Sequence, residues 1–377
     1  MEFGWSEAQN DLYERTLTFA REQLGARTGG GPFSIDEWRR VGEFGLLGLS
    51  VPERHRGLGL DALTTARAIE AFGRGCRDGG LVFSAAAHLF ACAMPVALHG
   101  DEALQARVLP RLASGEWIGA NAITEAEAGS DVTALKTTAR RDGSGYVLDG
   151  AKSYVTNGPC ADVILVYAKT APSDGYLGVT AFVVERGAVG LRVGEPFHKM
   201  GLESSPISSL YLDGCRVPAA NRVGQEGEGA AIFAASMAWE RSCLFAAYVG
   251  SMEWQLDECV AFAGQRRQFR RPIGKHQAIA HRIADMKLRL EGARLLLYRA
   301  CWLRDRGQEA TVEVALAKLA VSEAAIQSGL DAIQIHGGLG YMVESGVERA
   351  LRDAVPATIF SGTSEIQRDL VARGLGL

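Results

Sequence analysis

The chain has 377 residues, of which 47% are hydrophobic and 22% are charged, and its formal net charge is -4. Forty Lys and Arg residues against 44 Asp and Glu residues leave no overall basic field, which argues against nucleic acid as the main ligand. The length exceeds that of one ordinary hydrophobic core, so two or three packed units are expected.

Three segments of the chain differ in their residue pattern. Residues 1–115 repeat apolar side chains at helical spacing, which predicts an N-terminal helical domain. Residues 116–225 contain short β-branched runs separated by Gly, Asp and Pro, which predict a compact antiparallel β domain. Residues 226–377 return to helical periodicity in long segments, as in an antiparallel helical bundle. The predicted fold class is therefore α+β.

The N-terminus and the cysteines bear on where the protein works. The first 24 residues are acidic and amphipathic, unlike a secretory signal peptide. We expect no apolar run near ~20 residues without charge, and hence no membrane span. The seven cysteines are scattered without a Cys-x-x-Cys pair, so neither a disulfide framework nor a metal site is indicated, and a cytoplasmic location fits best.

Two short motifs in the β segment could contact a ligand. The turn Gly129-Ser130-Asp131 follows an apolar run and offers backbone N–H groups and a hydroxyl to a phosphate or a flavin edge. A plain structural turn explains these residues equally well. Tyr154 and Thr156 end another strand, where the ring could stack on a flavin and the hydroxyl could donate to it. An ordinary strand with a buried tyrosine is at least as good an explanation.

Two further motifs lie in the C-terminal segment. Residues 266–279 contain four arginines, and such a cluster suits a pyrophosphate because arginine offers forked donors. Most charge runs are nevertheless solvated surfaces. Gly337, Gly338 and Gly340 interrupt a helical pattern, and a helical glycine costs about 1 kcal/mol. Either a ligand or a crossing helix therefore approaches the backbone there.

Glu240 is the candidate general base. It lies between Met237, Trp239, Leu244 and Phe245, and burial among such side chains would raise its pKa toward the range useful for proton abstraction. The alternative is a glutamate on a helix surface, or one screened by the neighbouring arginine, as is usual for glutamate.

The order and spacing of these motifs resemble the flavin-dependent acyl-CoA dehydrogenases over nearly the whole chain. The segments that carry the resemblance are ITEAEAGSDV, KMGLESS followed by LYLDGCRVP, RRQF followed by HQAI, QIHGGLGY and GTSEIQR. The resemblance implies a helical domain, a central β domain and a C-terminal four-helix bundle. It also implies FAD at their junction, shared across a dimer contact within a homotetramer.

The resemblance assigns the cofactor-binding residues by their place in these motifs. The flavin and its phosphates would contact Ile123, Thr124, Gly129 and Ser130, with Tyr154, Val155 and Thr156 against the ring. The adenosine diphosphate half would be held from the neighbouring subunit by Arg266, Gln268, Phe269, Gln334, Gly337 and Gly338, and the adenosine contacts would be completed by Thr363 and Glu365.

The resemblance also locates the base. Most family members carry the catalytic glutamate directly before the Gly-Thr of the last motif, where this chain has Ser361. Serine cannot remove a Cα proton. A minority place the glutamate on the first bundle helix, just before an arginine, and Glu240-Arg241 matches that placement. Arg241 is then a candidate substrate-binding residue.

Within the family, several segments are most similar to the L-prolyl-carrier-protein dehydrogenases of pyrrole biosynthesis, which contribute to antibiotic pathways. This branch acts on an aminoacyl thioester held by a carrier protein on a phosphopantetheine arm. The predicted function is dehydrogenation of L-prolyl-carrier protein toward the pyrrole-2-carboxyl thioester. A short- or branched-chain acyl-CoA dehydrogenase is the alternative, and a non-catalytic scaffold of the same fold is a further one. The electron acceptor stays open.

Overall fold

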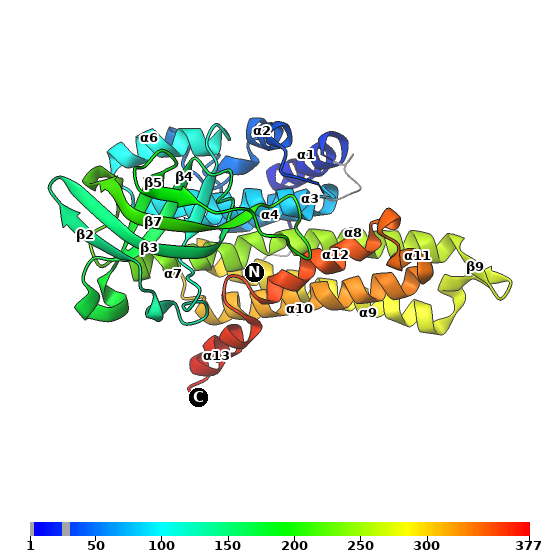
Figure 1. Cartoon of the computed structure of the whole chain (residues 1–377). Coiled ribbons are helices and arrows are strands. Elements are labelled where there is room, and N and C mark those ends of the chain that lie inside the picture. Colours follow the sequence, from blue (N-terminus) through cyan, green and yellow to red (C-terminus); the bar gives the residue numbers. More distant parts are fainter. Residues whose placement is uncertain (1–3, 25–30) are drawn as a thin grey trace.

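The computed structural model describes residues 4–24 and 31–377, so residues 1–3 and 25–30 of the predicted N-terminal domain lie outside the described residues. Figure 1 shows a β domain at one end of the molecule, long helices that run away from it, and a layer of N-terminal helices beside both. The α+β fold class, with an N-terminal helical part, a central β part and a C-terminal helical part, is confirmed.

Most N-terminal helices begin at a polar residue that satisfies a free backbone N–H. Ser6 and Gln9 form a capping box at the first helix, and the side chains of Asp61 and Asp101 accept backbone N–H groups at two others. The helices are α1 (Glu7–Gln23), α2 (Ile35–Phe44), α3 (Ala62–Gly75), α4 (Gly79–Ala87), α5 (Met94–His99) and α6 (Glu102–Ala113).

One helical stretch overturns an expectation. The segment α4, the π-helical turn η3 (His88–Ala93) and α5 together form a helix over Gly79–His99, whose 21 residues are long and apolar enough to cross a membrane. The expectation that no apolar run approaches this length is therefore wrong. However, 83% of its apolar window is buried inside the protein. The stretch is apolar on all sides because it is a core helix.

The β domain is one twisted sheet in the order β6-β7-β3-β2-β4-β5-β8, with β1 paired to β4. The predicted antiparallel arrangement holds for most pairs but not for all, because β4 pairs in parallel with β1 and with β2. The strands are β1 (Gly119–Ala122), β2 (Thr138–Asp142), β3 (Gly145–Thr156), β4 (Val163–Lys169), β5 (Val179–Glu185), β6 (Leu191–Val193), β7 (Ile207–Pro218) and β8 (Arg222–Val223).

The C-terminal helices are long because their apolar faces pack on one another. A hairpin of β9 (Arg267–Gln268) and β10 (Arg271–Pro272) joins the first two long helices at the end of the bundle far from the sheet (Figure 1). The helices are α7 (Gly229–Trp239), η7 (Glu240–Leu244), α8 (Ala246–Gln265), α9 (Gln277–Asp305), α10 (Thr311–His336), α11 (Gly338–Tyr341), α12 (Val347–Ala354) and α13 (Ser364–Gly374).

Short 3-10 turns connect these elements. They are η1 (Leu46–Gly48), η2 (Glu53–His55), η4 (Val132–Ala134), η5 (Pro172–Gly178), η6 (Ala219–Asn221), η8 (Ile273–Lys275), η9 (Val343–Ser345) and η10 (Val355–Thr358).

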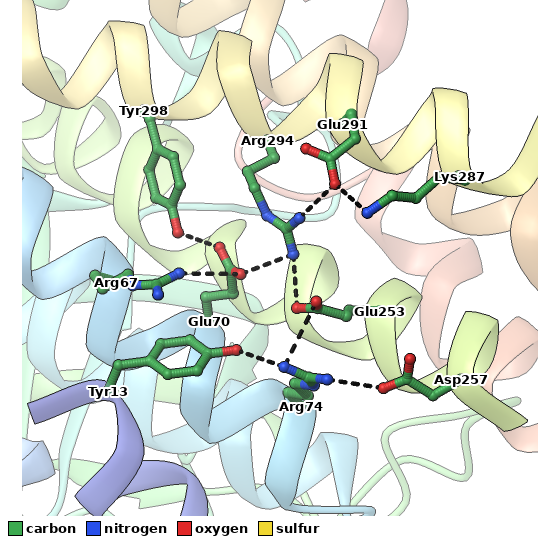
Figure 2. A network of polar contacts seen from close by, with 10 residues as sticks. All are labelled: Tyr13, Arg67, Glu70, Arg74, Glu253, Asp257, Lys287, Glu291, Arg294 and Tyr298. Carbon is green, nitrogen blue, oxygen red and sulfur yellow. Dashed lines mark hydrogen bonds and ion pairs between the residues drawn. The ribbon is translucent and has the colours of Figure 1, made fainter. Parts of the chain in front are cut away.

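A buried polar network joins the N-terminal helices to the bundle (Figure 2). At its centre Glu70 of α3 is fully buried and accepts a charged hydrogen bond of 2.9 Å from Arg294 of α9. The Tyr298 hydroxyl also donates to Glu70, and Arg294 continues to Glu253 of α8 at 2.6 Å. Because these three connections each cross from one helix to another, the network fixes the relative positions of α3, α8 and α9.

Candidate active site

A cavity of about 570 Å³ opens between the β domain, the η3 turn and the start of the bundle. Its volume lies within the range of small-molecule and cofactor sites, about 300–1,000 Å³. It is lined by residues of β1 and of the loop that follows it up to Val132, by the end of β3, by α7 and η7, and by the turn before α13. The cavity therefore gathers segments from the β domain and both helical parts.

A π-helical turn, η7, presents Glu240 to this cavity. The turn inserts an extra residue between α7 and α8, and such turns are frequent at functional sites. The carbonyl of Ala238, just before the turn, accepts hydrogen bonds from the Arg304 side chain and, at 2.6 Å, from the Ser242 hydroxyl. These donors stabilise the η7 turn, from which the Glu240 side chain points toward the cavity.

Glu240 has the electrostatic environment of a general base. It is 8% exposed, and burial raises its pKa to about 7, although the hydrogen bond from Ser361 and the nearby Arg241 charge both oppose this rise. Within residues 4–24 and 31–377, the carboxylate has one side-chain donor, the Ser361 hydroxyl, 2.8 Å from Oε2. A carboxylate with a pKa near neutrality can accept a proton from an acidic C–H group.

Hydrogen bonds from Arg241 and Gln367 fix the turn that carries Ser361. Ser361 and Gly362 have φ values of 54° and 89°, both in the left-handed region, which a small residue adopts with the least strain. The Ser361 carbonyl accepts a hydrogen bond of 2.7 Å from Nε of Arg241, and Gln367 donates to the Gly362 carbonyl at 3.0 Å. Arg241 therefore orients the turn whose Ser361 hydroxyl contacts Glu240.

The loop after β1 is fixed by a buried ion pair that the sequence reading missed. Lys152 of β3 donates to Glu125 at 2.8 Å and to the Ile123 carbonyl at 3.1 Å. Burial lowers the pKa of Lys152 to about 8. Burial would raise the pKa of Glu125, but Lys152 and the donors of Lys136 and Thr137 hold it below its usual value. A lone lysine in a strand gave no sequence signal of this pair.

Tyr154 presents its ring to the cavity from a distorted part of β3. Its φ of 57° is left-handed, and the pairing of β3 with β7 shifts register between Lys152 and Val155. The irregular backbone leaves the ring 67% exposed and 5.7 Å from Phe197. A strained tyrosine beside a cavity is a ready platform for a planar ligand.

The structure brings together most of the residues predicted to contact the flavin or the substrate. Apart from the six residues assigned to a neighbouring subunit, two predicted residues are not among the lining residues. Val155 is buried in the core of the sheet, and Glu365 lies exposed on α13. The predicted residues that line the cavity are Ile123, Thr124, Gly129, Ser130, Tyr154, Thr156, Glu240, Arg241 and Thr363.

The remaining predicted residues lie at the other end of the bundle (Figure 1). Gln268 is in β9, and Phe269, in the turn of that hairpin, is 89% exposed with a left-handed φ. Gly337 ends α10 with φ 61° and Gly338 follows it. A Cβ added at either glycine would meet nothing within 4 Å among the described residues, so neither of the two marks a helix crossing.

The predicted residues of the β9–β10 hairpin and those at the end of α10 are neighbours of one another. The ring of His336, beside Gly337, stacks on Phe262 of α8 at 4.3 Å, four residues before Arg266. Arg266, Gln268 and Phe269 are thus close to Gln334, Gly337 and Gly338, as one exposed set at the tip of the bundle. Within one chain this set is remote from the cavity.

Comparison with known proteins agrees with this geometry. The N-terminal, middle and C-terminal domain models of acyl-CoA dehydrogenase match residues 6–116, 120–215 and 227–376. The chain is 51% identical to an L-prolyl peptidyl-carrier-protein dehydrogenase of Pseudomonas fluorescens over the full length of both. It is 43% identical to PigA, solved with FAD and proline, with TM-score 0.97 and full coverage of both chains. The prolyl acyl-carrier-protein oxidase AnaB is also 43% identical, with TM-score 0.96 and coverage of 99% and 100%.

Proposed function

The chain belongs to the acyl-CoA dehydrogenase family, and on this premise we propose that it is an FAD-dependent dehydrogenase of L-prolyl thioesters on a carrier protein. The product of its reaction leads toward the pyrrole-2-carboxyl thioester. The observation that carries the proposal is the buried Glu240 in the wall of the cavity, in a chain half identical to a prolyl-carrier-protein dehydrogenase.

The residues of the cavity fit FAD. Tyr154 offers an exposed ring against which an isoalloxazine can lie, and Thr124 and Thr156 line the same space with hydroxyl groups. A Cβ added at Gly129 would meet nothing within 4 Å, so this turn leaves room for a phosphate beside the exposed Ser130. FAD, when bound, supplies the acceptor for the hydride that leaves the substrate.

Glu240 performs the proton transfer in this proposal. The Cα–H of an acyl thioester is acidified by the adjacent carbonyl, and the Glu240 carboxylate takes that proton while the Cβ–H leaves with its electron pair. The chain thus removes one proton and one hydride, which together amount to a two-electron oxidation that forms a Cα–Cβ double bond. A second two-electron oxidation is required to reach the pyrrole ring.

The exposed set at the tip of the bundle supports an oligomer. We propose a homotetramer in which Arg266, Gln268, Phe269, Gln334, Gly337 and Gly338 complete the cofactor site of another subunit, since in their own chain they lie far from the cavity. A cytoplasmic location is supported by the seven cysteines, all of which are free, because free thiols persist in reducing compartments.

The test is anaerobic absorbance of the bound oxidised flavin. L-Prolyl-loaded carrier protein is added to one sample, and a panel of acyl-CoA thioesters is added to another. Bleaching with the prolyl carrier alone supports the proposal, and mass spectrometry of the phosphopantetheine arm then measures how far the ring is oxidised. Bleaching by a short or branched acyl-CoA alone would make the chain an acyl-CoA dehydrogenase instead. Protein that cannot be loaded with FAD would indicate a non-catalytic scaffold.

A further inference from the structure

A second cavity lies directly behind the active-site cavity. This distal cavity has a volume of about 160 Å³ and is lined by apolar side chains of α4, η7 and α8 and by Leu202, and also by charged residues that include Arg77, Glu344, Arg349 and Asp353. Phe83 of α4 lines both cavities. The two spaces are therefore neighbours that share one aromatic side chain as a partition.

Phe360 extends this partition, and two more aromatic rings pack against Phe360 without separating the cavities. Phe360 lines the active-site cavity, and its ring lies 4.7 Å from that of Phe83. Behind Phe360 lie Phe245 at 5.3 Å and Tyr248 at 6.4 Å, and Tyr248 lines the distal cavity. The Tyr248 hydroxyl donates to the Asp353 carbonyl at 3.1 Å, which fixes the far side. Packed rings of this kind leave little free volume between them.

The partition stands very close to the base. Phe360 directly precedes Ser361, whose hydroxyl contacts Glu240 at 2.8 Å. Glu240 and Phe360 line the same cavity, so a thioester whose Cα lies at Glu240 places its acyl group in a space that the ring of Phe360 bounds. A compact five-membered ring suits so short a space, whereas an extended alkyl chain would have to pass where the partition stands.

We propose that Phe83 and Phe360 form a wall that restricts the substrate to compact acyl groups by separating the active-site cavity from the distal cavity. This inference rests on the proposed function for the identity of the compact group. The distal cavity is a continuation of the substrate space that the wall cuts off. The apolar part of its lining, formed by Val82, Leu202, Leu244 and Ala247, would contact alkyl carbons once the rings of Phe83 and Phe360 are removed.

The test uses FAD-loaded enzyme with Phe83→Leu, Phe360→Leu and both changes together. Leucine keeps the positions apolar and removes the rings, so the variants are milder than alanine replacements. The matched control is Phe245→Leu, because Phe245 contacts Phe360 but belongs to the lining of neither cavity among the described residues. Carrier protein loaded with prolyl, butyryl, hexanoyl or octanoyl groups is mixed anaerobically with each enzyme, and the rate of flavin bleaching is recorded.

We expect the double variant to gain about tenfold or more in the rate with hexanoyl and octanoyl groups relative to the wild type, since each methylene placed in an apolar pocket contributes about tenfold or more. Butyryl should change less, and Phe245→Leu should keep the wild-type order of substrates. If the single and double variants stay unreactive with long chains while prolyl still bleaches the wild type, the wall is wrong and the proposed function stands. If prolyl fails with the wild type, the proposed function is wrong, and chain-length dependence in the variants still decides whether the wall exists.

Discussion

Glu240 and Glu70 are both buried glutamates, but their surroundings differ in almost every other respect. Glu70 is fully buried beside Arg294, Arg67 and the Tyr298 hydroxyl, all within the network of Figure 2. Burial raises its pKa, and Arg294 and Tyr298 oppose that rise. The Glu240 carboxylate, by contrast, has one hydroxyl donor among the side chains of the described residues.

This difference separates a carboxylate that joins helices from one whose charge is not compensated by an ion pair among the described residues. A buried charge is tolerated when an opposite charge and hydrogen bonds compensate for the lost water. Glu70 has both, and it joins helices. Among residues 4–24 and 31–377, Glu240 has no ion pair, because Nε of the adjacent Arg241 donates to the Ser361 carbonyl instead. The result is a carboxylate with a pKa of about 7, which can take up and release a proton near neutral pH.

The largest expected effect comes from Glu240→Gln. The amide cannot accept the Cα proton, so the rate of flavin bleaching should fall by about 10²–10⁴-fold, the usual contribution of a general base. Stopped-flow absorbance with substrate in excess measures it. The matched variant Glu70→Gln should retain the wild-type rate per molecule of folded enzyme. Full activity in Glu240→Gln with normal FAD content would show that another group is the base.

The second prediction concerns stability and removes the charged partner of Glu70. Arg294→Met removes the cation that compensates Glu70 and should destabilise the protein by about 3–5 kcal/mol, the usual cost of leaving a buried charge without its partner. Thermal or urea unfolding measures the loss. The double variant Arg294→Met/Glu70→Gln should recover part of it, because the uncompensated charge is then gone. Equal stability of the double and single variants would mean that burial of Glu70 is not the source of the cost.

Glu240 should also cost the protein stability in a pH-dependent way. Its pKa is raised on folding from 4.5 to about 7, so the folded state holds a proton that the unfolded state has released. The stability that the protein has when Glu240 is protonated is fully present below pH 4.5 and is lost as the pH rises through 7. Glu240→Gln should therefore match the wild type at about pH 4, below the unfolded pKa, and exceed it by about 3 kcal/mol at pH 8. Melting temperatures across this range measure the difference, and a constant offset would contradict it.

The smallest expected effect belongs to Ser361→Ala. Its hydroxyl stabilises the charged form of Glu240 and so lowers the pKa of that group. Without it the pKa should rise, and the limb of the pH profile where the rate increases with pH should move to higher pH by about one unit. The rate at pH 6 therefore falls while the rate at high pH is kept. Ser361→Thr supplies a hydroxyl in a more strained position and should recover part of the shift. An unmoved profile would show that Ser361 does not act on the base.

The sequence by itself determined the fold and most of the chemistry. Helical and strand periodicity predicted the order of helical, β and helical parts, because the side-chain pattern follows the local backbone. The resemblance to the acyl-CoA dehydrogenases pointed to Ile123, Ser130 and Thr363, and these residues line one cavity together with Glu240. Glu240 could be selected because its apolar neighbours in the chain already indicated burial.

Only the tertiary structure decided the features that depend on contacts between distant segments. The Lys152–Glu125 pair, the network around Glu70 and the Phe83–Phe360 wall join residues far apart in the chain, and no local pattern encodes their distances. The same reason explains the corrections. An all-apolar run such as Gly79–His99 suits a membrane or a protein core equally well, and packing within the folded protein decides between them. A strand's partners, parallel or antiparallel, are likewise chosen by the whole sheet.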